Sequence, residues 1–289
     1  MKTSPTTSRE DRVRAALLDV LHAQWRELGV PFHAAAFDHP QRFPLEVIDP
    51  EALLWCSLHF FGVEPRLEEA VRNWFTANRA RVNTQRLNTL AKRNELEPNE
   101  TTRVSAWRSI SGVRRLVTRK HIGVVASTPA SLHLRSRDVL GNDCAAYLIV
   151  VLLGSPRGVR CRDVADSTGY TYRCVADTAA SWADAGLVRM EHGFCTILDP
   201  TPWAQLLRCD VANVVTVDWQ AAYGAVLEYL QTLERARAAG VAEDSPILVA
   251  AATKAESVLQ GAAAGVAPER APAIEALRSA VQMRWGGTG

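Results

Sequence analysis

The stretch DSTGYTYRCVADTAASWADAGLVR, residues 166–189, decides the expected fold. Gly169 is placed to end a short helix, because glycine readily adopts the left-handed conformation that closes a helix. Thr171 is then placed to cap a second helix, which stops at Gly186. An apolar, β-branched segment follows directly. The stretch therefore predicts two short helices packed across a tight turn, followed by a strand.

The sequence on both sides extends this arrangement. NDCAAYLIVVLLG, residues 142–154, is typical of a buried helix, and Val159 to Cys161 is long enough for a very short strand. Further on, Glu191-His192-Gly193 separates two apolar runs, as expected for the turn of a β-hairpin. These segments predict one small domain over residues 139–200, with three helices and a hairpin.

The segment VADSTGYTYRCVADTAASWADAGLV resembles the winged helix-turn-helix domain of bacterial transcriptional regulators. That family has a short apolar helix, a glycine turn, a recognition helix begun by Ser or Thr, and an AGLV segment leading into the wing. The matching positions are Gly169, Thr171, Val175, Trp182 and residues 185–188. The resemblance covers about residues 134–198, under a quarter of the chain. It implies binding of double-stranded DNA, with the second helix in the major groove and the protein acting as a homodimer.

A helical wheel tests this implication on the second helix. Val175, Ala179 and Trp182 share one face, which we expect to pack inward, while Arg173 and Asp177 lie on the opposite face. Arginine is the commonest reader of guanine edges, so the start of the exposed face suits base contact. Asp177 opposes this interpretation, because a carboxylate repels phosphates.

Seven residues are candidates for DNA contact. Three near the start of the second helix are expected to approach bases, and three arginines before the turn are expected to hold phosphates. The wing tip adds one histidine. The candidates are Arg157, Arg160, Arg162, Thr171, Tyr172, Arg173 and His192.

The charge distribution leaves the partner open. The chain carries a formal net charge of +2, and residues 142–198 hold five basic and six acidic side chains. Phosphate contacts dominate DNA affinity, so this segment alone predicts weak binding. Residues 103–137 contain eight basic and no acidic side chains, and they supply the missing charge if they fold onto the same face. Alternatively, the basic run is a solvated face or an interdomain surface paired with acidic residues.

The remaining sequence predicts a mainly α-helical protein. We expect a helical N-terminal domain at residues 1–93, a linker and basic segment at 94–138, the winged helix-turn-helix at 139–200 and a C-terminal helical region at 201–289. Asp49-Pro50 and Ser245-Pro246 are helix starts. Trp55, Trp74 and Trp219 lie on apolar stripes and are assigned to cores. The helices from Trp219 onward are the candidate dimer interface.

Nothing in the sequence predicts catalysis, a cofactor or a metal. The six cysteines form no C-x-x-C pair and are expected to be reduced and mostly buried. No nucleotide-binding glycine loop, catalytic set or membrane-spanning run is present, and the N-terminus lacks a secretory pattern, so a cytoplasmic location is expected.

The expected function is a sequence-specific DNA-binding transcriptional regulator without enzyme activity. The alternative is a protein-interaction scaffold or antitoxin-like partner that uses the same fold without reading DNA. The sequence specifies neither the target DNA nor an effector ligand.

Overall fold

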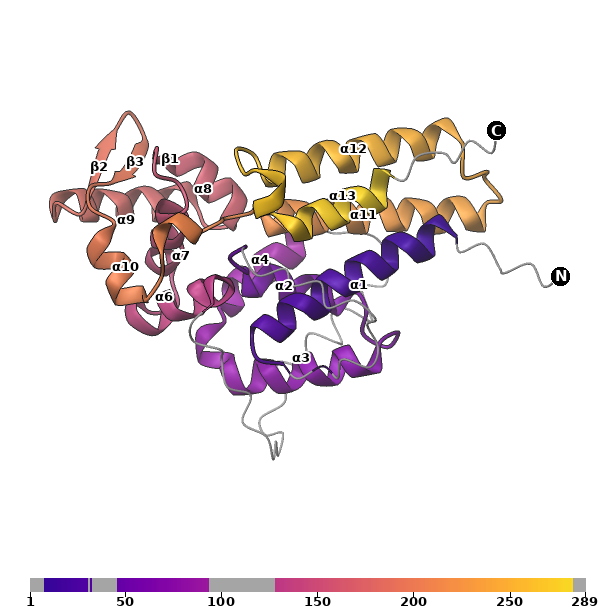
Figure 1. The fold of residues 1–289 in the computed structure, drawn as a ribbon, viewed down its shortest axis with the longest axis horizontal. Coiled ribbons are helices and arrows are strands. Elements are labelled where there is room, and N and C mark those ends of the chain that lie inside the picture. The colour runs from indigo at the N-terminus through magenta and orange to yellow at the C-terminus, as the bar shows by residue number, and fades with distance from the viewer. Residues whose placement is uncertain (1–7, 31, 33–45, 94–127, 283–289) are drawn as a thin grey trace.

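The computed structural model describes residues 8–30, 32, 46–93 and 128–282, and these are mainly helical with one small antiparallel sheet (Figure 1). The helices are α1 (Arg9–Glu27), α2 (Pro50–Leu58), α3 (Pro65–Asn78), α4 (Thr84–Arg93), α6 (Leu132–Leu140), α7 (Cys144–Leu153), α8 (Cys161–Thr168), α9 (Tyr172–Asp184), α10 (Thr201–Leu207), α11 (Trp219–Ala238), α12 (Pro246–Ala262) and α13 (Pro272–Gln282). The strands are β1 (Val159–Arg160), β2 (Val188–Glu191) and β3 (Phe194–Ile197).

Helix starts and ends follow the predicted local chemistry. The Asp49 carboxylate accepts hydrogen bonds from the backbone N–H groups of Glu51 and Ala52, which caps α2 with Pro50 in its first turn. Ser245 caps α12 in the same manner. Gly169 ends α8 at a φ of 78°, in the left-handed region where glycine avoids the strain of a β-carbon. These predicted boundaries are confirmed.

The helices α1–α4 and α11–α13 share one hydrophobic core, and we call them the helical unit. Figure 1 shows α11–α13 lying over α1 and α2, although more than a hundred residues separate the two groups in the chain. Direct contacts join α1 to α11 and α13, and α2 to α11. The regions expected at 1–93 and 201–289 therefore bury their apolar faces against each other.

This packing changes the expectation for the C-terminal helices. Trp219, Tyr223 and Val226, on the apolar stripe of α11, are each at most 1% exposed within the single chain. A face covered by its own chain is not available to a second copy, so a dimer interface on the helices from Trp219 onward has to use their other faces and stays a prediction. Trp55 and Trp74 are also buried, as predicted.

The second core belongs to α7, α8, α9 and the three strands, which we call the sheet unit. The strand order is β1-β3-β2, with Val159 opposite Cys195 and Val188 opposite Ile197. A two-residue turn joins β2 to β3, and its residues His192 and Gly193 have φ angles of 51° and 80°. Two successive positive φ angles are what a type I′ hairpin turn requires, so the predicted hairpin is confirmed.

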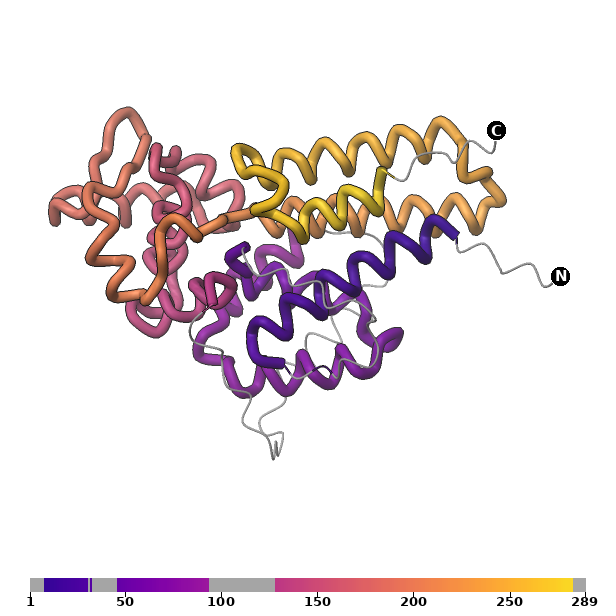
Figure 2. The backbone as a smooth tube through the Cα atoms, viewed as in Figure 1, coloured from indigo at the N-terminus to yellow at the C-terminus, as the bar shows by residue number. Residues whose placement is uncertain are grey.

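The chain enters and leaves the sheet unit next to the helical unit. Figure 2 shows it returning to α11 through a single extended segment before Trp219. The Val47 N–H donates to the Val215 carbonyl at 2.8 Å, and the Trp219 indole N–H donates to the Val47 carbonyl at 2.8 Å. These bonds attach the returning segment to the start of α2. Helix α6, which leads into the sheet unit, was not anticipated within the expected linker at 94–138.

Candidate functional site

Helix α9 presents the side chains singled out in the sequence. Val175 and Ala179 are fully buried against the rest of the sheet unit, while the Arg173 and Asp177 side chains are 90% and 71% exposed. The Thr171 hydroxyl oxygen accepts a hydrogen bond from the Cys174 N–H at 3.2 Å and thereby caps the helix. The first turn of α9 therefore stands at the surface with its backbone fixed.

Three candidate residues lie together in this first turn. Thr171, Tyr172 and Arg173 are all exposed, and Tyr172 retains 47% of its accessible surface. The Arg173 Nε lies 3.5 Å from the Asp177 carboxylate, one helical turn further along. An exposed pair of this kind is worth at most about 1 kcal/mol, so a stronger anionic partner can displace it.

The other candidates group around β1 and the hairpin. Arg160 in β1 is opposite Phe194 in β3, and its guanidinium lies 5.1 Å from the centre of the Phe194 ring. The Cys161 N–H donates to the Gly193 carbonyl at 2.9 Å, which ties the start of α8 to the hairpin turn. His192 is exposed at that turn.

Arg157 and Arg162 complete this second group, and both are exposed. Arg162 on α8 pairs with Asp166 at 3.4 Å, whereas Arg157, in the turn before β1, has no carboxylate partner among the described residues. No hydrogen bond or ion pair described for the chain joins this group to the first turn of α9. The structure thus holds the seven candidates in two separate exposed groups.

The basic run does not contribute as expected where it is described. Residues 103–127 of the run lie outside the described residues. Arg135 donates to the carbonyls of Leu207, Arg208 and Thr128, and Arg137 is 5% exposed. Arg135 is half-buried and bonds only to carbonyls, whereas Arg137 pairs with the buried Glu51 carboxylate and adds no charge to an exposed face. Of these two arginines, only Arg137 is paired with an acidic residue, as the alternative expects.

Arg137 belongs to a buried ion cluster, which we define as Asp49, Glu51, Arg86 and Arg137. All four side chains are at most 2% exposed. Arg86 binds both carboxylates, with its Nη1 donating to Asp49 at 2.7 Å and to Glu51 at 2.8 Å. Arg137 donates through both Nη atoms to Glu51, at 2.7 and 2.6 Å. Two negative and two positive charges thus balance in the interior.

The cluster joins the two units of the chain. Asp49 and Glu51 belong to the start of α2, Arg86 to α4 and Arg137 to α6. The Arg86 Nε also donates to the Thr168 carbonyl at the end of α8, one residue before the glycine turn. The helix pair α8–α9 is therefore attached through Arg86 to the helical unit.

The electrostatics keep Asp49 and Arg86 ionised. Burial raises the pKa of Asp49, but the charge and hydrogen bonds of Arg86 outweigh burial and hold the pKa below its usual range. Burial likewise lowers the pKa of Arg86, and the neighbouring carboxylates more than reverse that effect. Tyr147 is neutral, because burial raises its pKa well above 10, and its hydroxyl donates to Asp49 at 3.1 Å.

The sequence interpretation missed this cluster. Asp49 was identified only as a helix cap, and Arg137 only as part of a basic run. A signal was present in α4, where Arg86 and Leu90 are four residues apart and both lie on the buried face. A charged residue at a stripe position of an amphipathic helix points to a buried partner.

Other kinds of site find little support in the described part of the chain. No group of three or more His, Cys, Asp or Glu side chains there is arranged to hold a metal ion. None of the described helices has the length and apolar character needed to cross a bilayer. Cys56, Cys144, Cys161 and Cys195 are buried free thiols, as expected, whereas Cys174 in α9 is exposed. In comparisons with known proteins, no family model, curated protein or solved structure matches the chain.

Proposed function

We propose that the chain is a sequence-specific DNA-binding transcriptional regulator and that α7–α9 with β1–β3 act as a winged helix-turn-helix. The observation that carries the proposal is the exposed first turn of α9, capped by Thr171 and placed directly after a left-handed glycine turn. The element order helix, strand, helix, helix, hairpin supports it, as does the strand order β1-β3-β2. In such domains the third helix enters the major groove.

Roles for the candidate residues follow from their positions. Arg173 and Tyr172 approach base edges, because they are the most accessible long side chains of the first turn. The Thr171 hydroxyl keeps its proton free to donate to a phosphate, since its oxygen already accepts the cap bond. Arg157, Arg160 and Arg162 hold backbone phosphates, and His192 contacts the adjoining groove from the hairpin tip.

A protein-interaction scaffold is the second candidate function. The Arg173–Asp177 pair favours it, because the carboxylate neutralises the cation that is meant to read bases. Residues 142–198 also carry one more acidic than basic side chain. In this alternative, the exposed face of α9 meets another protein instead of a phosphate backbone.

Selection of DNA fragments by the purified full-length chain separates the two functions. A regulator enriches a defined short sequence, and its affinity falls steeply as salt rises, because each phosphate contact releases a counterion. A homodimer additionally selects a palindrome whose half-sites are about one helical turn, roughly 10 base pairs, apart. A scaffold enriches nothing at any salt concentration.

A matched pair of variants assigns the binding face. Arg173→Ala should weaken binding to the selected site by about 1–3 kcal/mol and relax the base preference at one position. Arg235→Ala removes the same charge from an exposed position near the far end of α11, away from the sheet unit (Figure 1), and should leave binding unchanged. Equal losses in the two variants would mean that α9 does not read the sequence.

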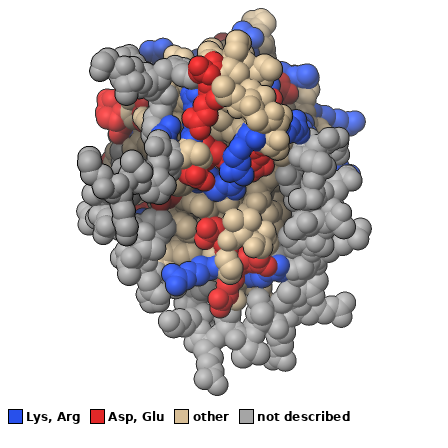
Figure 3. All heavy atoms as spheres, turned by 90° about the vertical axis from the view of Figure 1, so that its right-hand side faces the viewer, with Lys and Arg blue, Asp and Glu red and all other residues tan. Residues whose placement is uncertain are grey.

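The opposite end of the molecule offers a poorer surface for nucleic acid. On the face seen in Figure 3, basic and acidic side chains are interspersed over the described residues. At the N-terminal end of α1, Arg14 pairs with Glu234 at 2.6 Å, and Arg237 pairs with Glu10 at 3.1 Å. Among the described residues this alternation of charge gives no extended positive band, which supports the sheet unit as the candidate for the DNA contact.

A further inference from the structure

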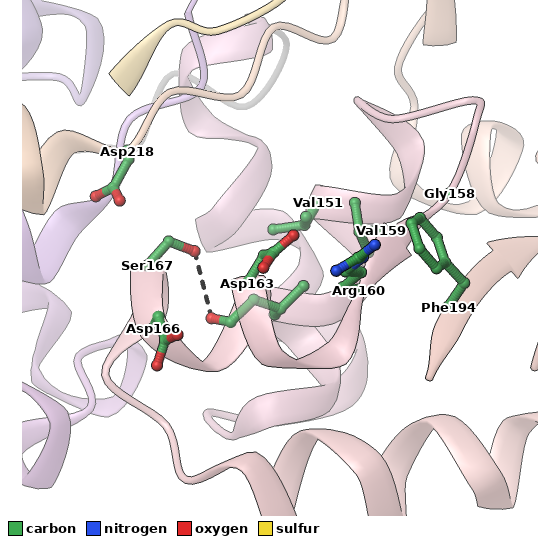
Figure 4. Close-up of a pocket in the computed structure, with 10 residues that line it drawn as sticks. Val151, Gly158, Val159, Arg160, Asp163, Asp166, Ser167, Phe194 and Asp218 are labelled. Carbon is green, nitrogen blue, oxygen red and sulfur yellow. Dashed lines mark hydrogen bonds between the residues drawn. The ribbon is translucent and has the colours of Figure 1, made fainter. Parts of the chain in front are cut away.

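A cavity of about 520 Å³ opens between α8 and the segment that leads into α11 (Figure 4). Asp218 borders it on the α11 side and Phe194 on the β3 side, with Asp163 and Ser167 of α8 and Arg160 of β1 between them. This volume lies within the range of about 300–1,000 Å³ typical of small-molecule sites. The cavity is therefore large enough for an organic ligand and is lined by both units of the chain.

A smaller cavity of about 90 Å³ continues inward from the first. The two share Val151, Ser167 and Asp218, and the inner one reaches His133 and Tyr147. His133 is 3% exposed, and its Nδ1 makes no hydrogen bond. A buried ring nitrogen without a partner is costly, but this atom is too enclosed for a ligand in the cavity to reach it.

The charges around the cavities favour a cation. The outer lining holds three carboxylates, those of Asp163, Asp166 and Asp218, and one guanidinium, that of Arg160, which is engaged with the Phe194 ring. Asp166 is paired with Arg162 outside the lining, which leaves Asp163 and Asp218 as the carboxylates without an arginine partner among the described residues. Burial raises the pKa of Asp218 to about 6, so near neutral pH this half-enclosed group is mostly an anion short of solvation. Burial lowers the pKa of His133 to about 3, so its imidazole is neutral and adds no positive charge to the lining of the inner cavity.

We propose that these connected cavities bind a small organic amine, with the ammonium group at the Asp218 carboxylate and an apolar body against Val151 and Phe194. An ammonium carries N–H donors that match the Asp218 carboxylate and the Ser167 hydroxyl oxygen, both of which belong to residues shared by the two cavities. A bare metal ion is a poorer match, because much of the lining is aliphatic or aromatic.

The ligand would contact α8 and the start of α11 together, and these elements belong to different units. Helix α8 packs directly on α9, so an occupied cavity acts on the element that carries the exposed turn. An effect of the amine on DNA affinity rests on the proposed function, but binding of the amine to the protein does not. The experiment therefore uses the protein and the amine without nucleic acid.

The experiment measures binding of benzylamine and 2-phenylethylamine to the full-length protein by isothermal titration calorimetry at neutral pH. The neutral analogues benzyl alcohol and 2-phenylethanol serve as shape controls. We expect at least one amine to bind with a dissociation constant below about 5 mM, which a fragment of this size reaches with ordinary efficiency. The alcohols should bind at least about tenfold more weakly, since a hydrogen bond between charged groups is lost.

Two variants and one control locate the site. Asp218→Asn should weaken amine binding at least about tenfold while keeping the cap of α11, because Asn caps a helix as well as Asp. Val151→Phe should block the apolar part without changing any charge. Asp244→Asn, an exposed aspartate before α12, should leave affinity unchanged. Absence of amine binding, equal binding of amine and alcohol, or unchanged affinity in Asp218→Asn would each overturn the proposal.

Discussion

Replacing Glu51 by Gln removes one charge from the buried ion cluster and tests whether the cluster holds the two units together. The Glu51 carboxylate accepts four hydrogen bonds, three of them from Arg86 and Arg137 at 2.6–2.8 Å and one from the Asn83 N–H at 2.7 Å. Gln keeps the volume but places an NH2 group against guanidinium donors. Two buried cations then face the single carboxylate of Asp49.

The expected loss of stability is large. Breaking a buried ion pair by neutralising one partner costs about 3–5 kcal/mol, because the other charge stays buried without compensation. A domain is stable by only about 5–15 kcal/mol in total, so Glu51→Gln removes a substantial share. The loss should appear as a lower urea midpoint, followed by tryptophan fluorescence and circular dichroism.

The control and the double variant make the reasoning refutable. Glu234→Gln neutralises the exposed partner of Arg14 and should cost at most about 1 kcal/mol. Combining Glu51→Gln with Arg137→Met removes the uncompensated cation together with its partner and should recover at least about 1 kcal/mol relative to additivity. A loss below about 1 kcal/mol in Glu51→Gln, or strict additivity in the double variant, would refute an energetic role for the cluster.

Three further outcomes follow from the structure. Burial raises the pKa of Glu46 from 4.5 to about 7, so between these pH values the folded chain holds a proton that the unfolded chain has released. The free energy of unfolding therefore falls as pH rises through this window. Glu46→Gln should remove about 2–3 kcal/mol of this decline, measured by urea unfolding between pH 5 and 8. Gly158 and Gly193 have similar φ angles, +84° and +80°, but a β-carbon at Gly158 would lie 2.3 Å from the Thr196 hydroxyl, whereas one at Gly193 would face open space. Thermal unfolding should therefore show that Gly158→Ala costs about 1–3 kcal/mol more stability than Gly193→Ala. Thr171→Ala should cost about 1 kcal/mol by loss of the α9 cap, and Thr171→Ser should restore most of it in the same denaturation assay.

The features of the fold that were predicted correctly, such as helix caps and the hairpin turn, depend on residues that are close together in the sequence. A cap such as Thr171 acts on an N–H three residues away, and a hairpin turn needs only the φ preferences of His192 and Gly193. The exposed face of α9 follows from the helical period for the same reason. Local rules therefore placed the candidate residues at the surface, while their contact with DNA stays a prediction.

The contacts that the sequence did not reveal join distant segments. Glu51 and Arg137 are 86 positions apart, and the Trp219 indole bonds to a carbonyl 172 positions earlier. An amphipathic stripe shows that a face is buried but not which element covers it, so the stripe of α11 suited a dimer as well as an intrachain core. A run of arginines likewise gives no direction for its side chains: Arg137 turns inward, and the half-buried Arg135 bonds to backbone carbonyls.

The number of arginines that hold phosphates sets the salt dependence of DNA binding. In the described part of the chain the proposed phosphate contacts of charged side chains come from Arg157, Arg160 and Arg162, so a plot of log affinity against log salt should have a slope of about −3 per protomer. If the six basic residues between 103 and 120 also hold phosphates, the slope should steepen to about −8. Because the two values differ by more than twofold, one salt titration on the selected site decides whether the basic run belongs to the binding surface. A slope near zero would contradict both arrangements and leave the scaffold function.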